Sequence, residues 1–211
     1  MPGLIRGLEP DRIRANLERV RERVGSEVEI LAASKYVPLE EMGTLAEAGV
    51  TLVGENRQQD LEAKHERWGG AFEWDFIGNL QSRKVRRIFP LVRLIHSVCT
   101  ESALDKLAAL DPDPESEILV QVDVAGEEQK GGLPPAELGP FIGASPVRVG
   151  GLATMPPFTT DPEASRPHFA RLAELAAEHG LGRLSMGTSQ DWQVAVEEGA
   201  TIIRLGTELY A

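Results

Sequence analysis

Eight short apolar runs separated by helical segments are the feature that most constrains how this chain can fold. The runs are VEILAAS, VTLVGE, EWDFIG, VRLIHS, EILVQVDV, VRVGGLAT, GRLSMG and TIIRLG, beginning at residues 28, 50, 73, 92, 117, 147, 182 and 201. The segments between them, such as ESALDKLAAL and SRPHFARLAELAAEHG, carry apolar residues at the three and four spacing of an amphipathic helix. This alternation predicts a parallel sheet with short helical crossovers.

The number of repeating units predicts a closed barrel. Eight βα units of about 25 residues each use nearly all of the 211 residues. We therefore expect an α/β fold, a single (β/α)8 TIM-type barrel domain over residues 1–211. An extra N-terminal helix, about Pro10–Val24, is expected to fill the place of a helix after the last strand. An open doubly wound sheet is the alternative, but no glycine-rich dinucleotide fingerprint follows the first strand.

Composition and charge exclude several classes of protein. The formal net charge of −11 argues against a nucleic-acid partner, and the only basic run, SRKVRR, is typical of a solvated helix face. One cysteine, Cys99, and the absence of a leader or a long apolar run predict a cytoplasmic protein that contacts no membrane. The histidines lack metal-ligand spacing, so no metal is expected. His96 alone ends a predicted strand, where a structural role is favoured over a catalytic one.

The predicted strand ends carry polar and glycine-rich residues, and in such a barrel the carboxyl ends of the strands form the functional rim. Lys35 directly follows the first strand. Partial desolvation there would lower the pKa of its amine and make it a nucleophile that can form an imine. The alternative is a lysine that reaches from the strand end to solvent. The residues at other strand ends are needed to choose between a nucleophilic lysine and a solvated one.

The last two strand ends point to a phosphate group. Thr188 or Ser189 is expected to cap the helix after the seventh strand, with Asp191 in its first turn. After the eighth strand, Gly206 would let the backbone approach a ligand and Thr207 would offer a hydroxyl. Gly206 could equally serve only a tight turn.

These motifs, taken in order, resemble a known family. The segments ASKYVP, GENRQQD, WDFIGNLQSRK, HSV, QVDVAGEEQKGG, GLATMPP, LSMGTSQDWQVAVEEGAT and RLGT run nearly from end to end of the chain. They resemble the pyridoxal 5′-phosphate homeostasis protein family, whose fold is similar to the N-terminal barrel of alanine racemase. The resemblance implies pyridoxal 5′-phosphate (PLP) as cofactor, held as a covalent imine on Lys35.

The resemblance also implies the remaining cofactor-binding residues. Ser189, Gly206 and Thr207 would surround the phosphate with Thr188 adjacent, Arg204 would face the pyridine nitrogen, and Asn56 and the residues from Phe76 to Gly78 would lie along the ring. The chain departs from the family at Asp75 and Asn79, where histidine is common, and at Ala153 and Thr188, where methionines appear. These departures are expected to affect the outer pocket only.

The resemblance favours a carrier over an enzyme. A guanidinium beside the pyridine nitrogen disfavours its protonation and so weakens the ring as an electron sink. Racemisation also needs a second acid or base, which in alanine racemase is a tyrosine from an additional C-terminal domain of a partner subunit, whereas this chain ends at Ala211. Of its own phenols, only Tyr36 and Tyr210 are candidates.

We therefore expect a monomeric protein of PLP homeostasis that binds the cofactor reversibly and supplies it, with PLP-dependent apo-enzymes as possible partners. Two alternatives stay open. One is a PLP-dependent, racemase-like enzyme. The other is a barrel enzyme for sugar-phosphate or indole-type substrates, which would keep the phosphate site and leave Lys35 unexplained.

Overall fold

The parallel barrel expected from the sequence is confirmed. In a computed structural model, residues 3–126 and 131–211 are described. The strands are β1 (Glu29–Ala33), β2 (Leu52–Glu55), β3 (Glu73–Phe76), β4 (Leu94–Ile95), β5 (Glu117–Gln121), β6 (Arg148–Ala153), β7 (Arg183–Thr188) and β8 (Ile202–Leu205). All pair in parallel in the order β4-β3-β2-β1-β8-β7-β6-β5. A bridge between Val98 and Val120 joins the two edges and closes the barrel.

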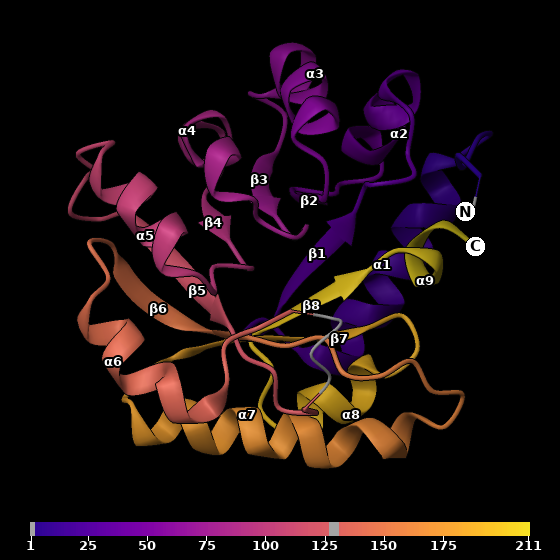
Figure 1. Cartoon of the computed structure of the whole chain (residues 1–211). Helices are drawn as coiled ribbons and strands as arrows, with labels where there is room; N and C mark the ends of the chain where they lie inside the picture. The colour runs from indigo at the N-terminus through magenta and orange to yellow at the C-terminus, as the bar shows by residue number, and fades with distance from the viewer. Residues whose placement is uncertain (1–2, 127–130) are drawn as a thin grey trace.

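Helices surround the barrel, as Figure 1 shows. They are α1 (Pro10–Val24), α2 (Met42–Glu47), α3 (Gln58–Trp68), α4 (Val85–Ile88), α5 (Glu101–Ala108), α6 (Leu138–Gly143), α7 (Arg166–Glu178), α8 (Trp192–Glu197) and α9 (Thr207–Tyr210). Part of the GEEQKGG motif, residues 127–130, lies outside the described residues. Among the residues described, no helix combines the length and apolar character needed to cross a membrane.

The N-terminal helix has the expected bounds and packs against the end of the chain. Helix α1 begins with Pro10 in its first turn, where a missing backbone N–H costs nothing. Its buried residue Asn16 donates hydrogen bonds from Nδ2 to the carbonyl oxygens of Leu209 and Ala211, both at 3.0 Å. In Figure 1, α1 and α9 lie side by side. The C-terminal segment of the chain, which follows the last strand, is thereby fixed to the first helix.

Strand alternation divides the apolar residues into two cores. The outer core fills the space between strands and helices, and it includes Phe76 and Ile203. A smaller inner core lies inside the barrel and consists of Leu31, Leu52, Leu94, Leu119, Ala153 and Ile202. Because successive residues of a strand point to opposite faces, the inner positions alternate with the outer ones. Some inward positions carry polar residues instead, among them Asp75, Ser185 and Arg204.

Candidate functional site

A cavity of about 530 Å³ opens at the carboxyl ends of β1, β2, β3, β7 and β8. Eight of the residues expected at a cofactor site line it: Lys35, Asn56, Gly78, Thr188, Ser189, Arg204, Gly206 and Thr207. They come from positions as far apart in sequence as the first and last strands. Parallel pairing of β1 with β8 brings these ends together, since it places Leu31 opposite Arg204. The cavity is therefore built by the closure of the barrel.

Lys35 lies half-buried in a turn directly after β1. Its Nζ lies 5.2 Å from the centre of the Tyr36 ring, and no ion pair with a carboxylate is formed within the described residues. Burial lowers the pKa of the Lys35 amine, and the positive charge of Arg204 lowers it further. A larger fraction of neutral, nucleophilic amine follows at any given pH.

A second lysine, Lys64, fixes the end of β1 through hydrogen bonds. Lys64, on α3, is buried, and its Nζ donates to the carbonyl oxygen of Ser34 at 2.9 Å and to the carboxylate of Glu55. The Ser34 hydroxyl donates to the same carboxylate oxygen at 2.7 Å. These bonds fix the residue that precedes Lys35. The chain thus contains one lysine that is paired and structural beside one that faces the cavity.

Arg204 enters the cavity wall from the middle of β8 and is buried. Its Nη1 donates to the carbonyl and the hydroxyl of Ser185, at 2.7 and 2.6 Å, and its Nη2 donates to the carbonyl of Thr154 at 2.8 Å. Burial lowers the pKa of Arg204 to about 10, although the charge of Asp191 acts in the opposite direction. The guanidinium therefore remains charged at neutral pH.

The loops after β7 and β8 meet through the hydroxyl of Ser189, whose Oγ accepts hydrogen bonds from the backbone N–H groups of Gly206 and Glu208 at 3.1 and 3.2 Å. Gly206 has a negative φ of −121°, and a Cβ there would come no closer than 3.9 Å to Ala33. Neither a left-handed backbone nor packing within the protein requires a glycine there. The open space beside it belongs to the cavity.

The start of α8 differs from the expectation. Thr188 is the last residue of β7, and neither Thr188 nor Ser189 caps the helix. Asp191 takes the capping position, and its Oδ1 accepts from the backbone N–H and the hydroxyl of Thr188 at 2.7 and 3.1 Å. Ser165 donates to the other carboxylate oxygen at 2.9 Å. The buried carboxylate accepts these donors and so fixes the loop, which leaves Ser189 free to bind the backbone of α9.

The structure corrects the placement of Phe76. It is the last residue of β3 and points outward into the core between sheet and helices, so it does not line the cavity. The next residue, Ile77, points inward and takes that place. Gly78 does line the cavity, and a Cβ there would lie 2.1 Å from the carbonyl oxygen of Asn56. Gly78 therefore lets the loops after β2 and β3 touch.

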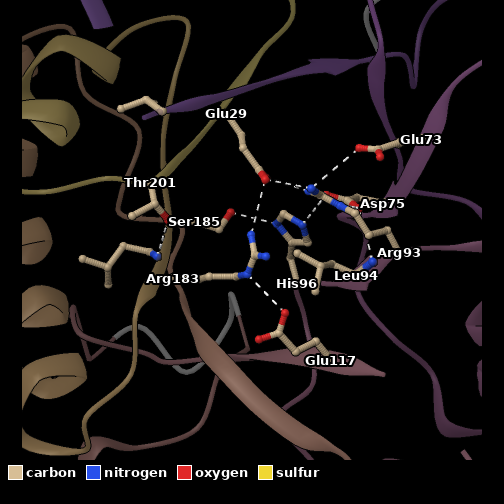
Figure 2. Close-up of polar contacts among 12 residues, drawn as sticks. Glu29, Glu73, Asp75, Arg93, Leu94, His96, Glu117, Arg183, Ser185 and Thr201 are labelled. Atoms are coloured by element: carbon tan, nitrogen blue, oxygen red, sulfur yellow. Dashed lines mark hydrogen bonds and ion pairs between the residues drawn. The ribbon is translucent and has the colours of Figure 1, made fainter. Parts of the chain in front are cut away.

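The two positions at which the family commonly has histidine, Asp75 and Asn79, lie in different places. Asn79 lines the cavity, in agreement with a role in the outer pocket. Asp75 does not: it is fully buried inside the barrel, where its carboxylate is bonded to Arg93 and to His96. The expectation for Asp75 was wrong because the residue occupies an inward position in the middle of β3. Figure 2 shows the polar contacts around it.

Several cavity residues were not named from the sequence, among them Ile5, Met155 and Gln190, whereas Tyr36 and Tyr210 were considered only as candidate acids or bases. Gln190 directly follows the expected Ser189, and in such a loop the backbone conformation, not the alternation along a strand, decides which side chains face the cavity. The buried hydroxyl of Tyr210 has no hydrogen-bond partner among the described residues, and burial raises its pKa. Both phenols considered from the sequence thus reach the cavity.

A family model described as the N-terminal domain of alanine racemase matches residues 8–211. A protein of Aquifex aeolicus named pyridoxal phosphate homeostasis protein is 38% identical over 95% of this chain and 96% of its own length. A protein of the same name from Vibrio cholerae is 32% identical over 95% of this chain and 93% of its own length.

Solved structures agree with these relatives. PipY from Synechococcus elongatus, with PLP bound, has a TM-score of 0.82 and 30% identity, covering 94% of this chain and 100% of PipY. An alanine racemase of Clostridium difficile has a TM-score of 0.74 at 13% identity, over 96% of this chain and 57% of that protein. The second likeness concerns the fold alone.

Proposed function

Because this chain belongs to the alanine racemase N-terminal domain family, and within it to the pyridoxal phosphate homeostasis proteins, we propose that it binds PLP reversibly and keeps it available to other proteins. The observation that carries the proposal is the convergence of Lys35 and Arg204 on one cavity without a carboxylate paired to either among the described residues. Two cations on one wall favour a ligand that carries phosphate and phenolate charge.

Lys35 is proposed as the residue that attaches the cofactor. Its amine would add to the aldehyde carbon and form an imine with loss of water, and its lowered pKa favours that step at neutral pH. The same bond would be reversible: water would return the free aldehyde and the Lys35 amine, whereas another amine would displace Lys35 and leave with the aldehyde as its own imine. Asn56, Gly78 and Ile77 would lie along the ring.

The phosphate is proposed to bind between the β7 and β8 loops. Ser189 and Thr207 offer hydroxyls there, Gly206 leaves the space open, and Thr188 is adjacent. The backbone N–H groups of Gly206 and Glu208, which now bond to the Ser189 hydroxyl, are suitable donors for phosphate oxygens. Binding would then exchange one acceptor for another and leave no buried donor unpaired.

Arg204 is proposed to face the ring nitrogen and so to limit chemistry. PLP supplies an electron sink that is strongest when the ring nitrogen is protonated, and a charged guanidinium beside it disfavours that protonation. Tyr210 could contribute a proton acceptor only as phenolate, and its raised pKa opposes that form. Binding without turnover is therefore the proposed function, in a cytoplasmic monomer whose recipients include PLP-dependent apo-enzymes.

The attachment is tested with borohydride. PLP is added to the purified protein, the mixture is reduced, and the modified peptide is identified by mass spectrometry. We expect the adduct on Lys35 and its loss in Lys35→Ala, whereas Lys106→Ala, an exposed control on α5, should behave as wild type. Recovery of the adduct chiefly on Lys84 would overturn the assignment of Lys35, and a protein that gains no visible absorbance with PLP would overturn the cofactor.

The absence of turnover needs a separate test. The PLP-loaded protein is incubated with L-alanine and L-serine in deuterated water, and deuterium at Cα and the D-enantiomers are measured. We expect neither to accumulate beyond about one equivalent per protein. Many turnovers in the wild type, abolished in Lys35→Ala, would instead establish the racemase-like alternative.

A further inference from the structure

A buried chain of polar side chains runs through the barrel interior below the cavity. It starts at Arg204, continues through Ser185, His96 and Asp75, and reaches Arg93 at the opposite end. Figure 2 shows the part from Ser185 onward. Ser185, His96 and Asp75 are buried among inward leucines, where polar groups cost stability unless every one is paired. We refer to Ser185, His96 and Asp75 as the buried relay.

The hydrogen bonds of the relay have a single consistent direction. A guanidinium only donates, so the hydroxyl oxygen of Ser185 accepts from Arg204 Nη1 at 2.6 Å. The carboxylate of Asp75 only accepts, so Nε2 of His96, 3.0 Å from Oδ2, carries the imidazole proton. Nδ1 of the neutral ring is then bare and accepts from the Ser185 hydroxyl, 2.8 Å away.

The electrostatics of the relay agree with that direction. Burial lowers the pKa of His96, and the charges of Arg204 and Arg93 lower it further, although Asp75 opposes them. Burial alone would raise the pKa of Asp75, but hydrogen bonds from His96 and Arg93 outweigh it and hold that pKa below its ordinary value. At neutral pH His96 is then neutral and Asp75 is charged, as the hydrogen-bond direction requires.

We propose that Ser185, His96 and Asp75 are positioning residues that fix the guanidinium of Arg204 against the ring nitrogen of the bound cofactor. The proposal rests on the PLP binding proposed above. Both Nη atoms of Arg204 are committed to Ser185 and Thr154, which leaves Nε as the nitrogen without a hydrogen-bond partner in the described part of the chain. Because the relay dictates where the Ser185 hydroxyl points, it also restricts rotation of the guanidinium.

The test separates the ring nitrogen from the rest of the ligand. PLP is compared with 1-deazapyridoxal 5′-phosphate, which keeps the aldehyde and phosphate but has a C–H in place of the ring nitrogen. A hydrogen bond from a charged donor corresponds to about a tenfold difference in affinity or more. We expect wild-type protein to prefer PLP by at least that factor.

Variants of the relay should remove this preference without weakening the deaza analogue. Ser185→Ala and His96→Leu each break the relay, whereas His96→Gln keeps one donor and one acceptor and should retain most of the preference. Thr201→Val is the matched control, because it removes a hydrogen bond that Leu184 N–H on β7 donates at 2.8 Å to the Thr201 hydroxyl, directly before β8, without changing a contact of Arg204. The Thr201→Val protein should keep the wild-type preference for PLP over the deaza analogue.

The proton positions are read separately, by ¹⁵N NMR of the His96 ring in the protein without ligand. Wild type should carry its proton on Nε2. In Asp75→Asn, Arg93 can only donate, so it selects the amide oxygen and turns the amide N–H₂ toward His96. The proton should then move to Nδ1, and the preference for PLP should fall with it.

The outcomes are distinct. If wild type binds PLP but does not distinguish the deaza analogue, or if the relay variants weaken both ligands equally, the positioning role is wrong and the carrier function stands. A proton on Nδ1 in wild type would overturn the direction of the relay. Failure of wild type to bind PLP would overturn the proposed function and the positioning role together.

Discussion

Charged side chains are paired at one end of the barrel, whereas two cations at the other end have no paired carboxylate among the described residues. At the end where the strands begin, cations and anions alternate: Arg93 pairs with Glu29 at 2.7 Å, Arg183 reaches Glu29 at 3.3 Å and Glu117 at 3.2 Å, and Arg148 pairs with Glu117 at 2.8 Å. Figure 2 shows most of this cluster, which we call the base cluster. At the rim, Lys35 and Arg204 face the cavity with no carboxylate paired to either in the described residues.

This difference in charge pairing shows how an acidic protein can provide a cavity suited to an anion. In a protein of net charge −11, the charges of the base cluster pair with one another and with Asp75, which binds Arg93, whereas Lys35 and Arg204 at the rim have no such partner among the described residues. Charges that are paired stabilise the fold but project little field, whereas unpaired cations at a cavity lower the pKa of a neighbouring amine and attract an anionic ligand. The base is thus expected to control stability and the rim to control binding.

The largest effect should come from breaking the base cluster. Arg93→Ala leaves the fully buried carboxylate of Asp75 without its cationic partner, and loss of one member of a buried pair costs about 3–5 kcal/mol. Urea unfolding of the ligand-free protein measures this loss. Arg87→Ala, which removes an exposed pair with Glu62, should cost less than about 1 kcal/mol. Equal losses in the two variants would show that the base cluster does not control stability.

At the rim, the largest effect should be on ligand affinity rather than stability. Thr207 is exposed, so Thr207→Val should leave unfolding nearly unchanged. Loss of a hydrogen bond to a charged group costs about 1.5–3 kcal/mol, or roughly ten- to a hundredfold in PLP affinity. Pyridoxal, which has no phosphate, serves as the control ligand and should bind both proteins alike. An equal loss for both ligands would place the hydroxyl away from the phosphate.

Acid titration should show the contribution of the base cluster to stability, because Glu29 is one of its carboxylates. Burial would raise the pKa of Glu29, but hydrogen bonds and charges from Arg93 and Arg183 bring it below the ordinary value. Its contribution to stability is therefore complete above the unfolded-state pKa and is lost as pH falls through the folded-state pKa. Between about pH 5 and 3, wild type should lose more unfolding free energy than Glu29→Gln. Parallel pH profiles for the two proteins would contradict the prediction.

The smallest effect concerns the reactivity of Lys35. Burial is the main cause of its lowered pKa and Arg204 the second, so Arg204→Gln should raise that pKa without restoring its ordinary value. The rate at which Lys35 is acylated should then begin to rise at a higher pH, which peptide mass spectrometry can follow. Lys106, on the surface of α5, is the internal reference. An unchanged profile would mean that the two cations do not interact.

Much of the fold and part of the site could be predicted from the sequence. The period of apolar runs is enough to predict eight strands, and strand ends such as Ser34-Lys35 locate the rim because parallel strands end on one side. Phe76 was misplaced because membership of a motif does not specify which face of a strand a residue occupies. The start of α8 was misplaced because Asp191 is buried and accepts bonds from distant Ser165.

The buried relay could not be predicted from local pattern. Asp75, His96 and Ser185 lie on or directly after three different strands, and each is a polar residue within a largely apolar run, which by itself is compatible with an exposed edge. Their contacts depend on the order of strands around the barrel. One signal was available: Glu29, Glu117, Arg148 and Arg183 each begin a strand, and such a repeat of charges at one end indicates a paired cluster.

The pairing of β1 with β8 also has a consequence for how the protein is made. Ribosomes deliver the chain from its N-terminus, so β1 emerges early and must wait for Ile202 to Leu205 before its second edge is covered. Lys35 is exposed on the nascent chain during this interval, while Arg204, Gly206 and Thr207 have not yet emerged. Under the proposed function, cofactor capture is therefore confined to completed molecules, because a truncated translation product has Lys35 without the burial and the Arg204 charge that lower its pKa, and without the groups proposed to hold the phosphate.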